Sequence, residues 1–159
     1  MAHRIRDRAR GGAVAPRLVL DTNVWLDLLV FRDRAVTPLL DALERGAVEA
    51  VIAPRMRDEL RRVLAYPALA LGDDTRSRAL EALASLAVPV AEPSARAAPR
   101  CRDPDDQMFV DLALDARAHA LLSRDDALLR MAARLRREGI EVMTPAAWCA
   151  VYRPQISKR

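Results

Sequence analysis

The stretch that indicates the fold most clearly is RLVLDTNVWLDLLV, residues 17–30. Its start predicts a short buried strand, Arg17–Leu20, because apolar side chains follow one another there without alternation. Thr22-Asn23 predicts a turn before an apolar-faced helix, Val24–Val30. A buried strand followed by a helix is the first half of a β-α-β unit, and it leaves Asp21 at the carboxyl end of the strand.

The same alternation continues along the rest of the chain. Further strands are predicted at Val48–Ile52, Val88–Val90, Ala120–Leu122 and Ile140–Met143. Helices are predicted at Val36–Arg45, Pro54–Ala65, Gly72–Leu86, from Asp103 onward, at Asp126–Arg137 and from Pro145 onward. Short apolar strands that alternate with amphipathic helices predict an α/β fold, a three-layer α/β/α sandwich around a mostly parallel central sheet.

Size and composition are those of one compact domain. The chain has 159 residues, 52% of them apolar, so a single core is expected. We predict a basic N-terminal arm at residues 1–16, the domain at 17–152 and a C-terminal tail at 153–159. No apolar run approaches the roughly 20 residues of a membrane span, and no apolar signal core follows the arginine-rich start. With only two cysteines, which lack metal-ligand spacing, the sequence predicts a cytoplasmic protein with no membrane association.

The charge of the chain is positive and comes from arginine. The net charge is +4, and Lys158 is the only lysine. Arginine forms forked contacts with phosphate oxygens, so a polyanionic partner such as a nucleic acid is expected. An excess of arginine also occurs on ordinary solvated surfaces, and charge alone therefore favours this partner only slightly.

Four acidic residues are predicted to meet at one edge of the sheet. Asp21 follows the first strand, and Asp125 follows the strand Ala120–Leu122. Asp106 lies in the first turn of the helix that leads to that strand, and Glu59 lies in the helix after the second strand. In parallel sheets, sites form beyond the carboxyl ends of the strands. Carboxylates that converge there repel one another unless a cation is bound, so the four predict a site for Mg²⁺ or Mn²⁺, which prefer oxygen ligands.

Each of these acids also has an ordinary structural explanation. Asp21 and Asp125 can each serve the N-terminus of the helix that follows. Asp103 is a suitable N-cap, with Asp106 three residues later as its capping partner. Glu59 can pair with an arginine on the surface of its own helix. Only the joint placement of the four distinguishes a site from a set of caps.

Five short motifs, in this order along residues 17–150, resemble those of PIN domains. They are residues 18–25 (LVLDTNVW), residues 58–60 (DEL), residues 103–106 (DPDD) with Phe109 and Ala113, residues 121–125 (LLSRD) with Leu128-Leu129, and residues 142–145 (VMTP). The resemblance extends to the toxins of bacterial toxin–antitoxin pairs, the VapC-like ribonucleases.

This resemblance implies an RNA-cleaving hydrolase that uses Mg²⁺ or Mn²⁺, forms a homodimer and is silenced by an antitoxin protein whose peptide enters the acidic groove. By position, it implies a catalytic and metal-binding quartet of Asp21, Glu59, Asp106 and Asp125. The polar positions that support the site are matched by Asn23 and Ser123, with Asp103 as a further acid of the third motif. Asp106 is preferred in that motif because it stands three residues before Phe109.

Two positions of the fourth motif depart from the family pattern. Arg124 stands where the family often has glycine, and Ala127 stands where it often has a further aspartate. The loss of that aspartate weakens the case for a second metal ion.

Other functions compatible with an acid after the first strand fit less well. A haloacid-dehalogenase-type phosphatase needs a second acid at the position of Asn23, and a response-regulator receiver needs a lysine in its acidic pocket. The remaining alternative is a non-catalytic RNA- or partner-binding domain of the same fold. The intact set of four acids favours the enzyme, because bare carboxylates repel phosphate unless a metal ion is present.

Overall fold

The computed structural model describes residues 14–96 and 98–156, so most of the predicted N-terminal arm lies outside the described residues. The described residues form one five-stranded sheet in the order β3-β2-β1-β4-β5, and every strand pair is parallel. The strands are β1 (Arg17–Leu20), β2 (Glu49–Ile52), β3 (Ala87–Pro89), β4 (Ala120–Leu122) and β5 (Glu141–Met143). The predicted α/β class is confirmed, and the sheet is wholly rather than mostly parallel.

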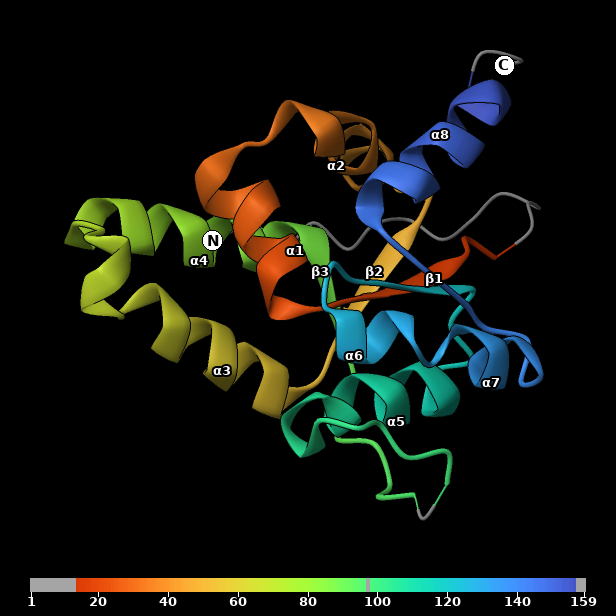
Figure 1. The fold of residues 1–159 in the computed structure, drawn as a ribbon. Coiled ribbons are helices and arrows are strands. Elements are labelled where there is room, and N and C mark those ends of the chain that lie inside the picture. The colour runs from red at the N-terminus through yellow and green to blue at the C-terminus, as the bar shows by residue number, and fades with distance from the viewer. Residues whose placement is uncertain (1–13, 97, 157–159) are drawn as a thin grey trace.

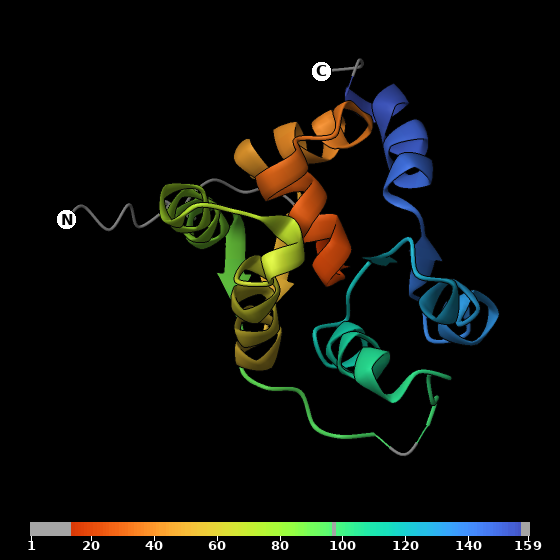
Figure 2. The same ribbon diagram turned by 60° about the vertical axis from the view of Figure 1, so that its left-hand side comes forward.

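Helices cover both faces of this sheet. They are α1 (Thr22–Leu26), α2 (Thr37–Glu44), α3 (Pro54–Leu64), α4 (Asp73–Leu86), α5 (Gln107–Asp115), α6 (Asp126–Leu129), α7 (Ala132–Arg136) and α8 (Pro145–Ile156). In Figure 1, α1, α2 and α8 lie above the strands, and α5, α6 and α7 lie below them. The turned view of Figure 2 shows the same separation. The predicted three-layer α/β/α sandwich is therefore present.

The central strand explains why the sequence shows no alternation there. Leu18, Val19 and Leu20 are all buried, although successive side chains of a strand point to opposite faces. Both faces of β1 lie under helices, so the three positions after Arg17 are all apolar. Within residues 14–96 and 98–156, every helix is too short or too polar to span a bilayer.

Several helices differ from their predicted bounds for local reasons. α1 begins at Thr22 rather than Val24, because the Asp21 carboxylate accepts a hydrogen bond from the Val24 N–H and caps the helix there. It continues as a π-helical segment, η1 (Asp27–Phe31).

The remaining differences concern the second half of the chain. The predicted helix Asp126–Arg137 is divided into α6 and α7, because the chain tightens to an i→i−3 hydrogen bond at Met131, whose side chain is fully buried. The predicted helix from Asp103 begins with a 3-10 turn, η4 (Pro104–Asp106), before α5. α8 continues to Ile156, four residues into the predicted tail.

Candidate active site

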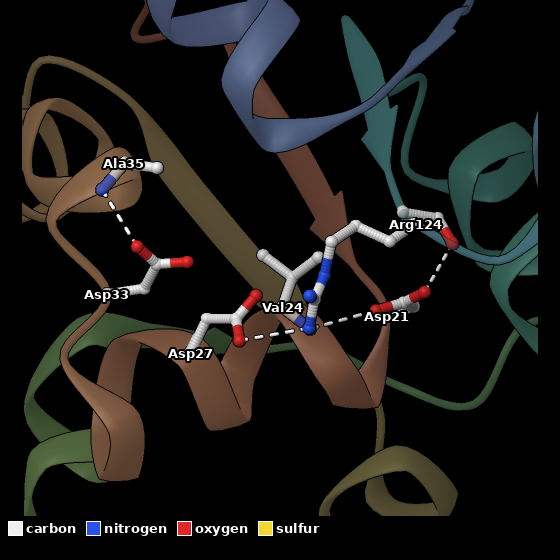
Figure 3. Close-up of polar contacts among 7 residues, drawn as sticks. Asp21, Val24, Asp27, Asp33, Ala35 and Arg124 are labelled. Atoms are coloured by element: carbon white, nitrogen blue, oxygen red, sulfur yellow. Dashed lines mark hydrogen bonds and ion pairs between the residues drawn. The ribbon is translucent and has the colours of Figure 1, made fainter.

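Asp21 and Ser123 lie side by side at the carboxyl edge of the sheet. The sheet order reverses between β1 and β4, and Leu20 pairs with Leu122 in register. The next residue of each strand is therefore brought to the same point, which is where sites of open parallel sheets form. The Ser123 hydroxyl donates to Asp21 Oδ2, and Asp21 Oδ1 accepts from the Val24 N–H at 2.9 Å. Figure 3 shows Asp21 at the start of its helix with the carboxylate directed at Val24.

Three further acids gather next to this point, and we call them the acidic group: Asp103, Asp106 and Asp125. One carboxylate oxygen of each lies within 4.8 Å of those of the other two. Asp125 follows β4, Asp103 precedes the 3-10 turn η4 at the start of α5, and Asp106 is the last residue of that turn. Side chains three residues apart eclipse one another in a 3-10 turn, so Asp103 and Asp106 share one side while Asp105 does not.

Two members of the acidic group cap helices and still lie close to the other carboxylates of the group. Asp103 Oδ1 accepts from the Asp105 N–H, and Asp125 Oδ1 accepts from the Ala127 N–H, as helix caps do. Each cap uses only one carboxylate oxygen and fixes the direction of the other. Asp106 makes no capping hydrogen bond, so the alternative role of capping partner that the sequence left open is not found, and its Oδ2 is buried without a hydrogen-bond partner. The caps therefore orient the carboxylates that surround an unsatisfied one.

The electrostatics of these acids are unfavourable as they stand. Burial raises the pKa of Asp106 to about 7, helped by a hydrogen bond that protonated Asp106 donates to Asp125 and by the charges of Asp125, Asp103 and Asp21. Burial also raises the pKa of Asp21, although its hydrogen bonds with Ser123 and Val24 oppose this. A set of carboxylate oxygens with one orphaned buried oxygen and mutual repulsion fits a hard divalent cation such as Mg²⁺ or Mn²⁺.

Glu59 and Asn23 lie outside the acidic group. Glu59 Oε2 accepts a hydrogen bond of 2.5 Å from the Thr22 hydroxyl, so α3 is joined to the residue next to Asp21. The pairing of Glu59 with Arg55 or Arg62 that the sequence allows is not found, since Glu59 forms no ion pair among residues 14–96 and 98–156. The Asn23 side chain is exposed.

Reasoning from sequence named Arg124 as a departure in the fourth motif but missed Asp27 and the ion pair between them. Arg124 Nη2 lies 2.9 Å from Asp27 Oδ1, and Figure 3 shows the arginine reaching across from the β4 side to Asp27. Asp27 is only 4% exposed, and burial raises its pKa, which the charge of Arg124 opposes. The signal for Asp27 was an acid inside the apolar stretch that follows Asn23; its partner lies 97 positions away and is visible only in the fold.

The comparisons with known proteins bear on this arrangement. The family model of the PIN domain matches residues 17–127, which is well over half of the chain. A search of curated proteins found no significant match. PIN domains are usually nucleases that use divalent metal ions, so the match indicates a nuclease-type function that acts on nucleic acid. By its sequence match and by its parallel α/β/α fold, this chain belongs to the PIN-domain family.

Proposed function

We propose that this chain is a metal-dependent ribonuclease that hydrolyses RNA phosphodiester bonds with Mg²⁺ or Mn²⁺. The observation that carries the proposal is the acidic group beside Asp21, with its buried and unpartnered Asp106 oxygen. Such a group favours binding of a divalent cation, because its negative charges repel one another. Within the described part of the chain, no arginine or lysine forms an ion pair with Asp106. A domain that only binds RNA gains nothing from carboxylates that repel phosphate.

The predicted quartet supplies the residues for this chemistry. Asp106 and Asp125 would hold the cation together with Asp103 and Asp21, and a bound cation supplies positive charge that acidifies water and offsets charge gained by the phosphate in the transition state. In hydrolysis, the water oxygen bonds to phosphorus while the bond to the leaving sugar oxygen breaks. Glu59 would orient the attacking water and accept its proton, and the leaving oxygen would take up a proton from solvent.

Supporting roles follow from the hydrogen bonds. The Ser123 hydroxyl donates to Asp21 and accepts from the Asp125 N–H at 2.8 Å, so it would hold two members of the quartet in a fixed relation. Thr22 would hold Glu59 toward the same edge. Asn23 is exposed and would contact the substrate rather than the metal ion.

The test is cleavage of a labelled single-stranded RNA by the purified chain. We expect cleavage with Mg²⁺ or Mn²⁺ and none after addition of EDTA. Asp21→Asn should lower the rate at least about 100-fold, the scale seen when a group that stabilises transition-state charge is removed. Asparagine still caps a helix, so the variant should remain folded. Asp126→Asn is the matched control, because Asp126 lies next to Asp125 but pairs with Arg130 on the surface.

Cleavage that persists in EDTA, or in Asp21→Asn at the normal rate, would refute the proposal. RNA binding without cleavage under any metal condition would instead favour the non-catalytic domain.

We also propose that the chain is the toxin of a type II toxin–antitoxin pair, a cytoplasmic homodimer silenced by an antitoxin protein. This part rests on the resemblance of the motifs to VapC-like ribonucleases. Induced expression in a bacterial host should arrest growth, whereas Asp21→Asn should not. Light scattering of the purified chain should give the mass of a dimer, and a small overlapping gene with a DNA-binding start should encode the antitoxin. Normal growth during expression of active enzyme would contradict the toxin role.

A further inference from the structure

A surface groove of about 720 Å³ lies beside Glu59, between α3 and the turn that opens α5. Its walls include arginines of α3, Tyr66 just after that helix, and Asp105 and Met108 from the other side. Figure 1 shows α3 next to the start of α5. Because Glu59 also belongs to the groove, a ligand lying in it would reach the proposed catalytic edge.

Three side chains on one face of α3, together with Tyr66 two residues after the helix, line this groove. Arg55, Glu59, Arg62 and Tyr66 are separated by four, three and four positions, the spacing that places side chains on one helix face. Arg62 stands three positions after Glu59 in α3, and Tyr66 stands seven positions after Glu59, just beyond the end of the helix. The groove is therefore lined by an aromatic ring as well as by the carboxylate of Glu59.

The groups on this face are available to a ligand. Tyr66 is 55% exposed, so its ring is accessible to a ligand in the groove. Within the described ranges its ring is not stacked on another, since the aromatic pair found there joins Trp148 and Tyr152. Arg55 and Arg62 form no ion pair among those residues, although Asp58 and Asp105 line the same groove.

We propose that this groove binds single-stranded RNA next to the cleaved bond, with a base stacked on Tyr66 and phosphates held by Arg62 and Arg55. The proposal deepens the ribonuclease function and rests on it for the identity of the substrate. An exposed ring flanked by arginines is the arrangement that binds single strands, because unpaired bases offer their faces for stacking. A duplex keeps its bases stacked inside and cannot use Tyr66. The groove thus selects unpaired RNA and sets its position.

Binding separates this proposal from catalysis. Fluorescence anisotropy of a labelled 12-nucleotide single strand is measured on the Asp21→Asn chain, whose expected loss of cleavage preserves the probe. In that background Tyr66→Ala should weaken binding about 5-fold to 100-fold, the range for loss of one base stack. Tyr66→Phe should bind within about twofold of the parent, because phenylalanine keeps the aromatic face. Phe31→Ala is the matched control: Phe31 is 56% exposed and lies away from this groove.

The arginine contribution has its own readout. Arg62→Gln should reduce the slope of log affinity against log salt by about 0.7, the value for one phosphate contact with a single strand. Arg137→Gln, a change of an exposed arginine at the end of α7, should leave the slope unchanged.

The outcomes distinguish the groove from the proposed function. Equal binding by the parent and Tyr66→Ala, or binding of a duplex as tight as that of the single strand, overturns the groove proposal even when metal-dependent cleavage is observed. Tyr66-dependent binding of the single strand supports the groove even when the unsubstituted chain cleaves nothing. Circular dichroism of each variant confirms that it is folded.

Discussion

Two acids near the carboxyl edge of the sheet differ in how their charge is balanced. Asp27 is almost fully buried, and the chain supplies its cation, since Arg124 lies 2.9 Å away. Asp106 is partly buried among other acids, and none of the ion pairs among residues 14–96 and 98–156 includes it. An acid that receives an arginine is satisfied by the fold, whereas an acid surrounded by other acids requires a cation from solution.

The largest difference between these acids should appear when a divalent cation is added. A cation that binds only the folded chain at 100 times its dissociation constant stabilises it by about 2.7 kcal/mol. For a chain of this size that corresponds to a rise in melting temperature of roughly 5–10 °C. Differential scanning calorimetry with Mg²⁺ or Mn²⁺ measures it.

Asp106→Asn should abolish this metal-induced rise, and Asp27→Asn should preserve it. A rise of equal size in Asp106→Asn would remove the distinction drawn between the two acids.

The pH dependence of stability should reveal the same repulsion in metal-free protein. The pKa of Asp106 is about 7 in the folded chain against an ordinary 3.8, so between these values the folded state holds a proton that the unfolded state has lost. Stability contributed by the protonated form is then lost as pH rises from about 4 to about 7. A pKa difference of about three units would correspond to about 4 kcal/mol in the free energy of unfolding. Because Asp106 is partly exposed, we expect a loss on the order of 2 kcal/mol.

Urea denaturation in EDTA at several pH values measures this loss. Asp106→Asn should flatten the profile over that interval, and saturating Mg²⁺ should do the same in the parent. A profile in Asp106→Asn as steep as that of the parent would assign the loss to other groups.

Removal of the positive charge of Arg124 should have a somewhat smaller effect on the free energy of unfolding. Arg124→Gln leaves Asp27 buried without its charged partner, which costs about 1–3 kcal/mol for a buried group. Arg124 is itself 53% exposed, so we expect the lower half of that range, about 1–2 kcal/mol.

A double-mutant cycle with Asp27→Asn isolates this pair. The two substitutions together should cost less than the sum of their separate effects. Strict additivity would show that the pair contributes no coupling energy.

The sequence predicted the elements of this edge better than their details. β1 and β4 have the predicted bounds, because a strand that is buried on both faces contains a run of consecutive apolar residues, which can be recognised from the sequence alone. The spacing from Phe109 favoured Asp106, but the sequence could not show that Asp103 joins it and Asp105 does not, since that depends on a 3-10 turn rather than an α-helical one. The Asp27–Arg124 pair was missed because it forms only after β1 and β4 pair. The catalytic roles of the quartet stay predictions.

The smallest expected effect concerns an exposed ion pair on the surface, which resembles neither the buried Asp27 nor Asp106 among its acidic neighbours. Asp126 Oδ2 lies 2.9 Å from Arg130 Nε, as close as Arg124 lies to Asp27, yet the side chains are 78% and 60% exposed. Water already solvates both charges, so an i,i+4 pair of this kind contributes about 0.3–0.5 kcal/mol. Asp126→Asn should therefore shift the urea midpoint much less than Arg124→Gln, and 1 M salt should remove most of the shift. If Asp126→Asn instead cost as much as Arg124→Gln, ion-pair distance rather than burial would govern these energies, and the contrast between Asp27 and Asp106 would lose its physical basis.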